Sequence, residues 1–451
     1  MKLYNTYTNK IEELKPLKEG QVSIYYCGPT VYNYIHIGNA RPIIFFDTLK
    51  KYLEHKGYKV IMASNFTDLN EKILKQSHVE GIPEMDVANK YIDAYLDDVR
   101  RLNADDSYIK PRVTETIPEI IDFIKKLVDN GSAYKTESGD VYFRVNSVPT
   151  YGALSNRKTE ELIQGARVEV RDEKESGYDF ALWKSFNEGI TYDSPWGVGR
   201  PGWHTECCVM INEIFKGMID IHGGGADLIF PHHENEIAQN EACYHNRLAN
   251  LWIHNARVNF GDEKMSKSLG NVIWTKDLTC DPLAYRLLVL SFPYRNIISY
   301  TEDLQNQFIK EYEKITQAYQ KAFMYLDVND LFDSSVETNE SKELVNRFDE
   351  ALDNDMNTAN GLTVIYDTLK QLNQNLRAPK DEKLITSLYN ALNMMLHVYG
   401  LDKKLTRMDA ETKALYNKWA EARSNKDFAL ADTLREELKN KGINLWFKNQ
   451  V

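Results

Sequence analysis

The alternation of apolar and polar positions divides the first part of the chain into strands and helices. Residues 22–27 form a β-rich apolar run, which the Gly-Pro pair at 28–29 ends as a turn. Apolar residues then recur at helical spacing over 38–55, and 58–63 predicts a second strand. Residues from about 86 to 130 predict two helices. A strand, a helix and a second strand in this order indicate the βαβ unit of an open parallel sheet, whose ligands bind at the carboxyl ends of its strands.

The pattern changes over residues 133–199. The apolar residues Val141, Phe143 and Val145 recur at every second position, which places them on one face of a strand. Glycine, serine, proline and charged residues interrupt the rest of this segment. We therefore predict that it is an insertion containing β-structure and that it lies outside the main sheet.

The first pattern returns after the insertion. A strand followed by a glycine-rich loop is predicted over 217–225, a helix over 232–244 and a further strand over 252–258. We assign 1–132 and 200–260 to one Rossmann-like catalytic domain that the insertion splits in sequence.

The remaining chain is predicted to be helical. Residues 261–300 form a linking region with a lysine-rich loop, and 301–400 form a helical bundle with breaks near 354–360 and 377–381. Residues 401–451 hold eleven Lys and Arg against eight Asp and Glu, so this region carries +3 while the rest of the chain carries −14. The predicted fold is thus α/β: a Rossmann-like parallel-sheet domain split by a connective insertion and followed by an all-α C-terminal helical bundle.

Composition narrows the functional class. The net charge of −11 argues against a protein that coats nucleic acid by bulk charge, although a local basic face is compatible with an acidic total. The first residues lack the apolar segment of a secretory signal, and no stretch approaches the ~18 apolar residues that span a bilayer. Five scattered cysteines indicate reduced thiols. We expect a cytoplasmic protein without a membrane partner.

Two segments carry groups suited to phosphate. His36 begins the motif His-Ile-Gly-Asn at a predicted helix N-terminus, where it either donates to phosphate oxygens or simply caps the helix. Residues 264–271 place two lysines and two serines in a loop, which is either a clamp on a polyphosphate or an ordinary surface loop. Neither a P-loop nor a dinucleotide fingerprint is present.

Two further groups suit a metal and a nucleoside. His232 and Glu236 stand four residues apart on one face of a predicted helix, and two cysteines from elsewhere would complete a four-ligand zinc set. The alternative is that the cysteines belong to the core and that the histidines are satisfied locally. Residues 222–227 place three glycines before Asp227, which suits contact with ribose hydroxyls or a tight turn.

Taken together, these segments closely resemble the cysteinyl-tRNA synthetase family. The resemblance rests on CGPTVYNYIHIGNAR at 27–41, GWHTEC at 202–207, HGGGADLIFPHHENEIAQ at 222–239 and KMSKS at 264–268. HIGN and KMSKS look like the two signatures of class I aminoacyl-tRNA synthetases, with Asn39 in place of the usual final histidine. The family implies ATP-dependent activation of L-cysteine to an adenylate and its transfer to the 3′ end of tRNA(Cys).

The resemblance also implies site residues. One Zn²⁺ per chain would bind Cys27, Cys207, His232 and Glu236 and select the substrate thiolate, so that no editing domain is needed. The implied catalytic residues are His36, Lys264 and Lys267. The implied ATP-binding residues are His36, Gly38, Asn39, Gly224, Asp227, Lys264, Ser266, Lys267 and Ser268, with Mg²⁺ accompanying ATP. The implied cysteine pocket contains Gly28, Thr67 and Trp203.

The family further implies a monomer with two surfaces for tRNA. The 133–199 insertion would lie near the acceptor end, and the basic 401–451 region would bind the anticodon. One alternative is a cysteine ligase of the mycothiol pathway, which lacks a full anticodon-binding region, whereas this chain has about 150 helical residues after the lysine loop. Another is a catalytically silent paralogue that binds tRNA or zinc, against which the intact lysine loop and His36 argue.

Overall fold

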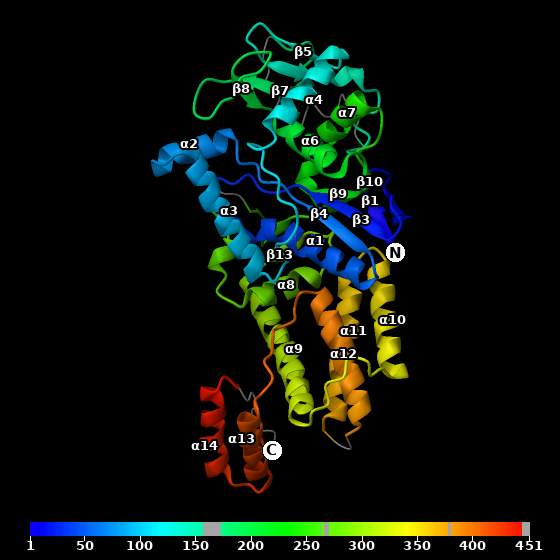
Figure 1. The fold of residues 1–451 in the computed structure, drawn as a ribbon, viewed down its shortest axis with the longest axis vertical. Coiled ribbons are helices and arrows are strands. Elements are labelled where there is room, and N and C mark those ends of the chain that lie inside the picture. Colours follow the sequence, from blue (N-terminus) through cyan, green and yellow to red (C-terminus); the bar gives the residue numbers. More distant parts are fainter. Residues whose placement is uncertain (157–172, 262, 266–269, 378–379, 444–451) are drawn as a thin grey trace. The chain divides into compact units, whose positions relative to one another are not determined.

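The structure is a computed structural model that describes residues 1–156, 173–261, 263–265, 270–377 and 380–443 (Figure 1). Its contacts divide the chain into two compact units. The first comprises 1–305 and 352–358, and the second comprises 306–351 and 359–451. No helix among the described residues has the length and apolar character needed to cross a membrane.

The first unit is built on a parallel sheet of four strands in the order β10-β9-β3-β4. β3 (Gln21–Tyr26) and β4 (Lys59–Ala63) are joined by α1 (Ile37–His55), and β9 (Ile219–Gly225) and β10 (Ala249–Asn255) are joined by α7 (Glu234–Tyr244). From β3 the chain passes through α1 to β4 at one edge of the sheet. From β9 it passes through α7 to β10 at the opposite edge. The boundary between β3 and β9 is therefore a topological switch point, where α/β sheets form ligand sites.

Helices cover both faces of this sheet (Figure 1). On one face, Tyr26 of β3 stacks on Phe46 of α1 with a centroid separation of 4.9 Å. On the other face, the Tyr25 hydroxyl lies 3.6 Å from the Met210 sulfur of α6 (Trp203–Phe215). Successive residues of a strand point to opposite faces, so one short apolar run contributes to both cores.

The insertion forms a sheet of its own. β5 (Ala133–Lys135), β6 (Val141–Phe143), β7 (Phe180–Ser185) and β8 (Gly199–Pro201) pair antiparallel in that order. The expected strand residue Val145 instead begins the short 3₁₀ helix η1 (Val145–Ser147). The remaining elements of the first unit are β1 (Lys2–Asn5), β2 (Lys10–Glu13), α2 (Glu71–Glu80), α3 (Glu84–Arg101), α4 (Ile117–Asp129), η2 (Ala226–Leu228), η3 (Ile229–His233), β11 (Val258–Phe260), β12 (Glu263–Lys264), η5 (Thr275–Asp277), α8 (Pro282–Leu290) and β13 (Ile298–Tyr300).

Two expected elements are placed differently by the structure. The glycines 223–225 belong to β9 and do not form a loop, because they pair with 253–255 of β10. A Cβ on Gly223 would lie 2.0 Å from the carbonyl oxygen of Ile253, so only glycine allows this approach. The strand expected over 252–258 ends at Asn255. The next two carbonyls, of Ala256 and Arg257, accept hydrogen bonds from the Arg41 guanidinium at 2.7 and 3.2 Å and are therefore directed away from strand pairing.

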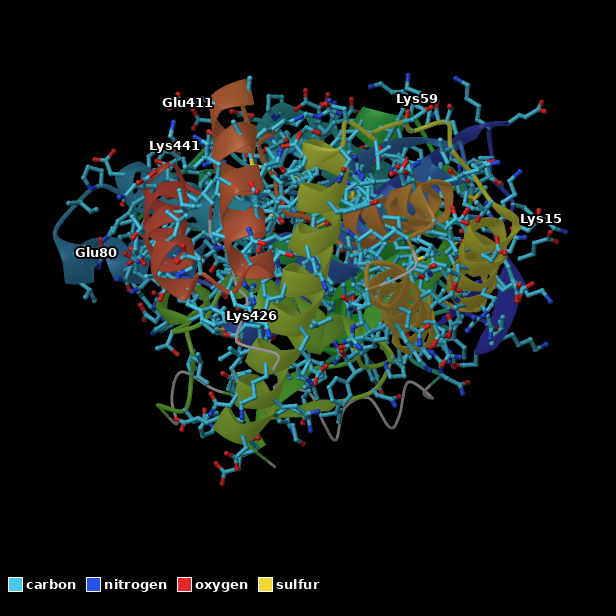
Figure 2. The ribbon with its side chains drawn as sticks, turned by 90° about the horizontal axis from the view of Figure 1, so that it is seen from below. Lys15, Lys59, Glu80, Glu411, Lys426 and Lys441 are labelled. Carbon is cyan, nitrogen blue, oxygen red and sulfur yellow. The ribbon has the colours of Figure 1, made fainter. Side chains whose placement is uncertain are left out.

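The second unit is helical throughout its secondary structure in the described residues. It contains most of α9 (Glu302–Val328) and α10 (Asn339–Asp353), together with α11 (Thr358–Asn375), α12 (Glu382–Val398), α13 (Ala410–Ser424) and α14 (Phe428–Asn440). Tyr319 and Tyr389 stack between α9 and α12 at 5.3 Å. α13 and α14 form a hairpin around Trp419 and Leu438, and Lys441 pairs with Glu411 at 3.0 Å (Figure 2). The architecture confirms the predicted α/β domain with a helical C-terminal region.

Candidate functional site

Four predicted metal ligands converge at the switch point of the sheet. Cys27 follows β3, Cys207 lies in α6, His232 lies in η3, and Glu236 lies in the first turn of α7. Their ligand atoms all lie within 4.8 Å of one another. The two sulfurs are 3.6 Å apart, and the Cys207 sulfur is 3.7 Å from His232 Nε2. Chain segments separated by about 200 residues thus supply one compact donor set.

The four-residue spacing of His232 and Glu236 gives the contact that the helical periodicity predicted. His232 Nε2 lies 2.8 Å from Glu236 Oε1, and both side chains are buried. His232 lies in η3, whose backbone is kinked at the extended residue Phe230, and α7 continues from Glu234. The turn keeps both side chains directed toward the cysteines.

Burial and charge perturb the four groups strongly. The hydrogen bond from Cys27 lowers the pKa of the Cys207 thiol to about 6, whereas burial raises the pKa of Cys27 well above its ordinary value. Burial opposes charge on His232, but the Glu236 carboxylate beside it raises the His232 pKa to about 10. Burial likewise opposes ionisation of Glu236, and the adjacent His232 holds the Glu236 pKa well below its usual range. A metal cation bound between the Cys207 thiolate and the Glu236 carboxylate would stabilise the charged forms of both groups.

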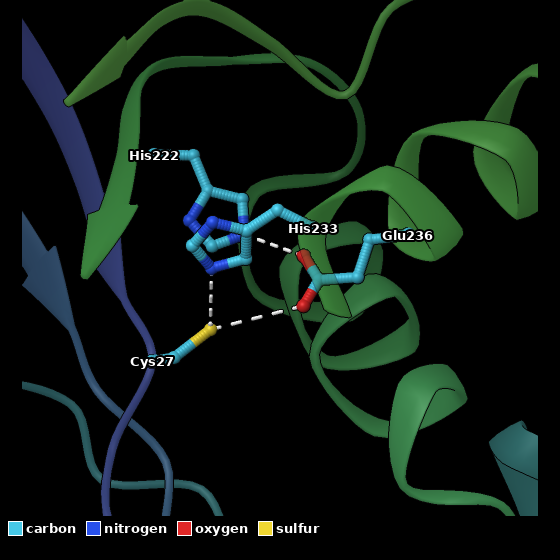
Figure 3. Close-up of side chains that lie close together, drawn as sticks. All are labelled: Cys27, His222, His233 and Glu236. Carbon is cyan, nitrogen blue, oxygen red and sulfur yellow. Dashed lines mark hydrogen bonds and ion pairs between the residues drawn. The ribbon is translucent and has the colours of Figure 1, made fainter. Parts of the chain in front are cut away.

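A second set of imidazoles surrounds the same centre (Figure 3). His233 Nε2 lies 3.2 Å from the Cys27 sulfur, and His222 Nε2 lies 2.6 Å from the second carboxylate oxygen of Glu236. Cys27, His222, His233 and Glu236 therefore form a second group with metal-ligand geometry, and it shares two members with the first. The sequence reasoning did not identify His222 and His233 as parts of this centre.

The predicted group contains both of the clustered cysteines. Two thiols, one imidazole and one carboxylate are the N, S and O donors that tetrahedral zinc accepts. Cys208 is absent from both groups in the described structure and lies in the hydrophobic core of the first unit. The donor chemistry of Cys27, Cys207, His232 and Glu236 therefore fits zinc.

The predicted cysteine pocket residues adjoin this centre. The Trp203 ring stacks on His232 at 4.1 Å and is 38% exposed, so one of its faces covers a ligand. The Gly28 N–H donates to the Asn65 side-chain oxygen at 2.9 Å, and the Thr67 hydroxyl donates to Glu206 at 2.8 Å. A Cβ on Gly28 would lie 1.7 Å from the Asn65 carbonyl oxygen, which excludes every other residue without a backbone shift.

A cavity of about 510 Å³ opens beside the end of β9 and the start of α1. Its walls include the predicted ATP-binding residues His36, Gly38, Asn39 and Asp227. His36 is the N-cap of α1, so the cavity also faces the positive end of a helix dipole.

The other predicted nucleotide residues are placed differently or lie outside the description. Gly225 lines the cavity in place of Gly224, whose Cβ position faces Leu228, His233 and Cys27. Lys264 forms β12 with Glu263. Ser266, Lys267 and Ser268 lie outside the described residues.

Sequence reasoning missed several residues that adjoin these sites. Asn65 and Glu206 contact the predicted pocket residues, and Arg257 and Arg295 line the cavity beside α1. Asn65 precedes a predicted pocket residue by two positions, and Glu206 precedes a predicted ligand by one. Proximity to named residues was the only signal in the sequence that could have found them.

Comparison with known proteins relates this geometry to a family. The family model described as "tRNA synthetases class I (C) catalytic domain" matches residues 13–310, and the DALR domain matches 347–403. A cysteine–tRNA ligase of Bacillus cytotoxicus is 45% identical over 448 residues, which cover 98% of this chain and 96% of that protein. A cysteine–tRNA ligase of Clostridioides difficile is 44% identical, over 98% of this chain and 97% of that protein.

Solved structures agree at the level of the fold. A methionyl-tRNA synthetase of Mycobacterium tuberculosis in complex with methionyl-adenylate superposes with a TM-score of 0.61 at 15% identity, covering 84% of this chain and 90% of that one. The curated relatives match through the helical C-terminal part as well as the catalytic part. The chain belongs to the cysteine–tRNA ligase family of class I aminoacyl-tRNA synthetases.

Proposed function

We propose that this protein activates L-cysteine with ATP to cysteinyl-adenylate and transfers cysteine to the 3′ end of tRNA(Cys), with zinc selecting the substrate thiol. The observation that carries the proposal is the cluster of Cys27, Cys207, His232 and Glu236 beside the cavity that holds His36 and Asp227. A metal centre beside a nucleotide-sized cavity provides one position for the side chain of an amino acid and another for ATP.

The four ligands would hold one zinc ion, which supplies a soft, Lewis-acidic position that prefers a thiolate to a serine hydroxyl. Trp203 restricts the approach to His232 from one side. Gly28 lets the backbone after β3 lie close to Asn65, because a Cβ there would be 1.7 Å from the Asn65 carbonyl oxygen. Thr67, which donates to Glu206, is the third proposed wall of the pocket.

The nucleotide side of the reaction depends mainly on position and charge. His36 at the α1 N-terminus is placed to stabilise phosphate charge as pyrophosphate leaves, and Asp227 to accept hydrogen bonds from ribose hydroxyls. We assign the same electrostatic role to Lys264 and Lys267 of the KMSKS loop, with ATP accompanied by Mg²⁺. The attacking group is the carboxylate of the substrate, so no protein nucleophile is required.

The partner surfaces belong to this proposal as well. The 133–199 insertion would lie near the acceptor end of tRNA, and 401–451 would engage the anticodon. α13 and α14 fall in that C-terminal region. We further propose that the enzyme acts as a monomer in the cytoplasm.

The test combines metal analysis with the two half-reactions. Purified protein is expected to hold about one zinc per chain, to catalyse cysteine-dependent pyrophosphate exchange, and to charge tRNA(Cys) with cysteine and not with serine. Absence of exchange in protein with zinc fully bound would contradict the proposal. Exchange followed by transfer to an amino sugar, with tRNA left uncharged, would identify the mycothiol-pathway reaction instead.

A further inference from the structure

A buried polar chain links the cysteine pocket to the metal centre. The Asn65 side-chain oxygen accepts from the Gly28 N–H at 2.9 Å, and its amide nitrogen donates to the Thr67 hydroxyl at 3.3 Å. The Thr67 hydroxyl in turn donates to Glu206 at 2.8 Å. Asn65 and Glu206 are each 1% exposed.

The position of Asn65 allows it to act on both sides of the site. It follows β4, and its neighbourhood extends the pairing of β3 and β4 beyond the strands, since Thr30 bridges Thr67 in parallel. The Cys207 sulfur lies 3.6 Å from the same Asn65 oxygen that accepts from Gly28. One side chain therefore contacts the segment that follows the ligand Cys27, a wall of the pocket, and a second ligand.

Hydrogen-bond capacity explains why an asparagine suits this position. An amide offers one acceptor and one donor group in a fixed geometry, and here the Gly28 N–H needs the acceptor while the Thr67 oxygen receives the donor. The single proton of the Thr67 hydroxyl is committed to Glu206. Because donors and acceptors are matched along this series of hydrogen bonds, the Thr67 rotamer and the Gly28 backbone position depend on each other.

We propose that Asn65 is a positioning residue for cysteine recognition, holding Gly28 and Thr67 in the geometry that the substrate requires, with Glu206 as the second anchor of Thr67. The proposal rests on the function proposed above. It assigns Asn65 no contact with ATP, because the residues around the nucleotide cavity do not include it in the described structure. The effect of losing Asn65 should therefore fall on cysteine and spare ATP.

The experiment measures both substrates in pyrophosphate exchange. Asn65→Ala is expected to raise the KM for cysteine by about tenfold or more, the size of supporting-residue effects at metal sites, while the KM for ATP stays within about twofold and one zinc is retained. Asn240→Ala is the matched control. Asn240 is also 1% exposed and hydrogen-bonded, but to Asn246 and Asn212, so its loss should change neither KM.

A double-mutant cycle separates positioning from a general loss of structure. Thr67→Val is made alone and with Asn65→Ala. If Asn65 acts partly through Thr67, the two effects are not independent. The rise in cysteine KM of the double variant should then be smaller, by a factor of about three or more, than the product of the two single rises. Should Asn65→Ala not fold, Asn65→Asp keeps the shape and the acceptor for Gly28 but loses the donor to Thr67, and the same cysteine-specific rise is expected.

Several results would overturn the proposal. These are an unchanged cysteine KM, a parallel rise in both KM values, loss of zinc from the Asn65 variants, or single effects that multiply in the double variant. They differ from failure of the proposed function itself, in which the unmodified enzyme with bound zinc would show no cysteine-dependent exchange.

Discussion

Two adjacent cysteines in α6 allow a sharp test of the metal centre. Cys207 has its sulfur 3.6 Å from that of Cys27 and 3.7 Å from His232 Nε2. Cys208, the next residue, is also fully buried and packs in the same apolar core, but it belongs to neither group of potential metal ligands in the described structure. We expect Cys207→Ala to impair zinc binding and Cys208→Ala to leave it unchanged.

The two substitutions should differ in kind as well as in size. Cys207→Ala removes one of four donors. Loss of a strong supporting contact weakens metal affinity by up to ~100-fold, so loss of a donor should weaken zinc affinity by at least that factor, or about 2.7 kcal/mol of binding free energy. Cys208→Ala leaves the donors in place and removes one buried sulfur atom, so it should lower the free energy of unfolding by about 1–2 kcal/mol through lost packing.

The assay is a competition of metal-free protein with a chromogenic chelator for zinc, together with urea unfolding of each variant. Cobalt substitution adds a direct count of thiolates, because the sulfur-to-cobalt charge-transfer band should weaken in Cys207→Ala only. Equal zinc affinities in the two variants, or loss of zinc from Cys208→Ala alone, would refute the assignment of Cys207 as the ligand.

Three further substitutions test other parts of the structure. Asp227→Ala should raise the KM for ATP in pyrophosphate exchange by about tenfold and leave the KM for cysteine unchanged, because Asp227 lines the nucleotide cavity. Burial raises the pKa of Asp98 to about 6, against the opposing charge of Arg101, so its ionisation costs stability, and this cost builds up as the pH rises from the ordinary value of 3.8 to about 6. Thermal unfolding should show Asp98→Asn matching the unmodified protein below pH 3.8, gaining on it between pH 3.8 and about 6, and keeping a constant advantage at higher pH. Arg286→Met should lower the free energy of unfolding by about 3 kcal/mol in urea, because it removes the buried guanidinium beside Asp47 and leaves Lys51, at 2.9 Å, to pair with that carboxylate.

The local elements of the catalytic unit could be predicted because their signals are local. The apolar run of β3 and the helical periodicity of α1 each lie within one short stretch of sequence, and the structure places both where expected. β9 was harder to delimit, because its glycines resemble a loop in sequence. Their strand conformation depends on the paired residues of β10, which lie 30 positions further along the chain and approach too closely for a side chain.

The site could be predicted only in part, because its members are brought together by tertiary structure. Spacing placed His232 and Glu236 on one face, and their 2.8 Å contact agrees with that prediction. No spacing connects Cys27 to Cys207, since their proximity depends on α6 packing against β3. The resemblance to a known family supplied this pairing, whereas Asn65 and Glu206 required side-chain geometry.

The neighbouring histidines show why donor chemistry decides what geometry leaves open. His232 and His233 are adjacent in sequence, both are buried, and each completes a four-ligand group with Cys27 and Glu236 (Figure 3). The group of His232 has two thiols, whereas that of His233 and His222 has one, and zinc binds thiolates strongly. His233 is also hydrogen-bonded through Nδ1 to His254 at 2.7 Å, and His222 through Nδ1 to the Tyr25 carbonyl at 3.1 Å. These bonds hold the His222 ring against Glu236 and the His233 ring against Cys27. Hydrogen bonds from neighbouring groups of this kind orient the side chains that bind a metal. The same cluster thus fits the proposed four-ligand zinc site and explains why two of the proposed ligands, Cys27 and Glu236, would be held rigidly.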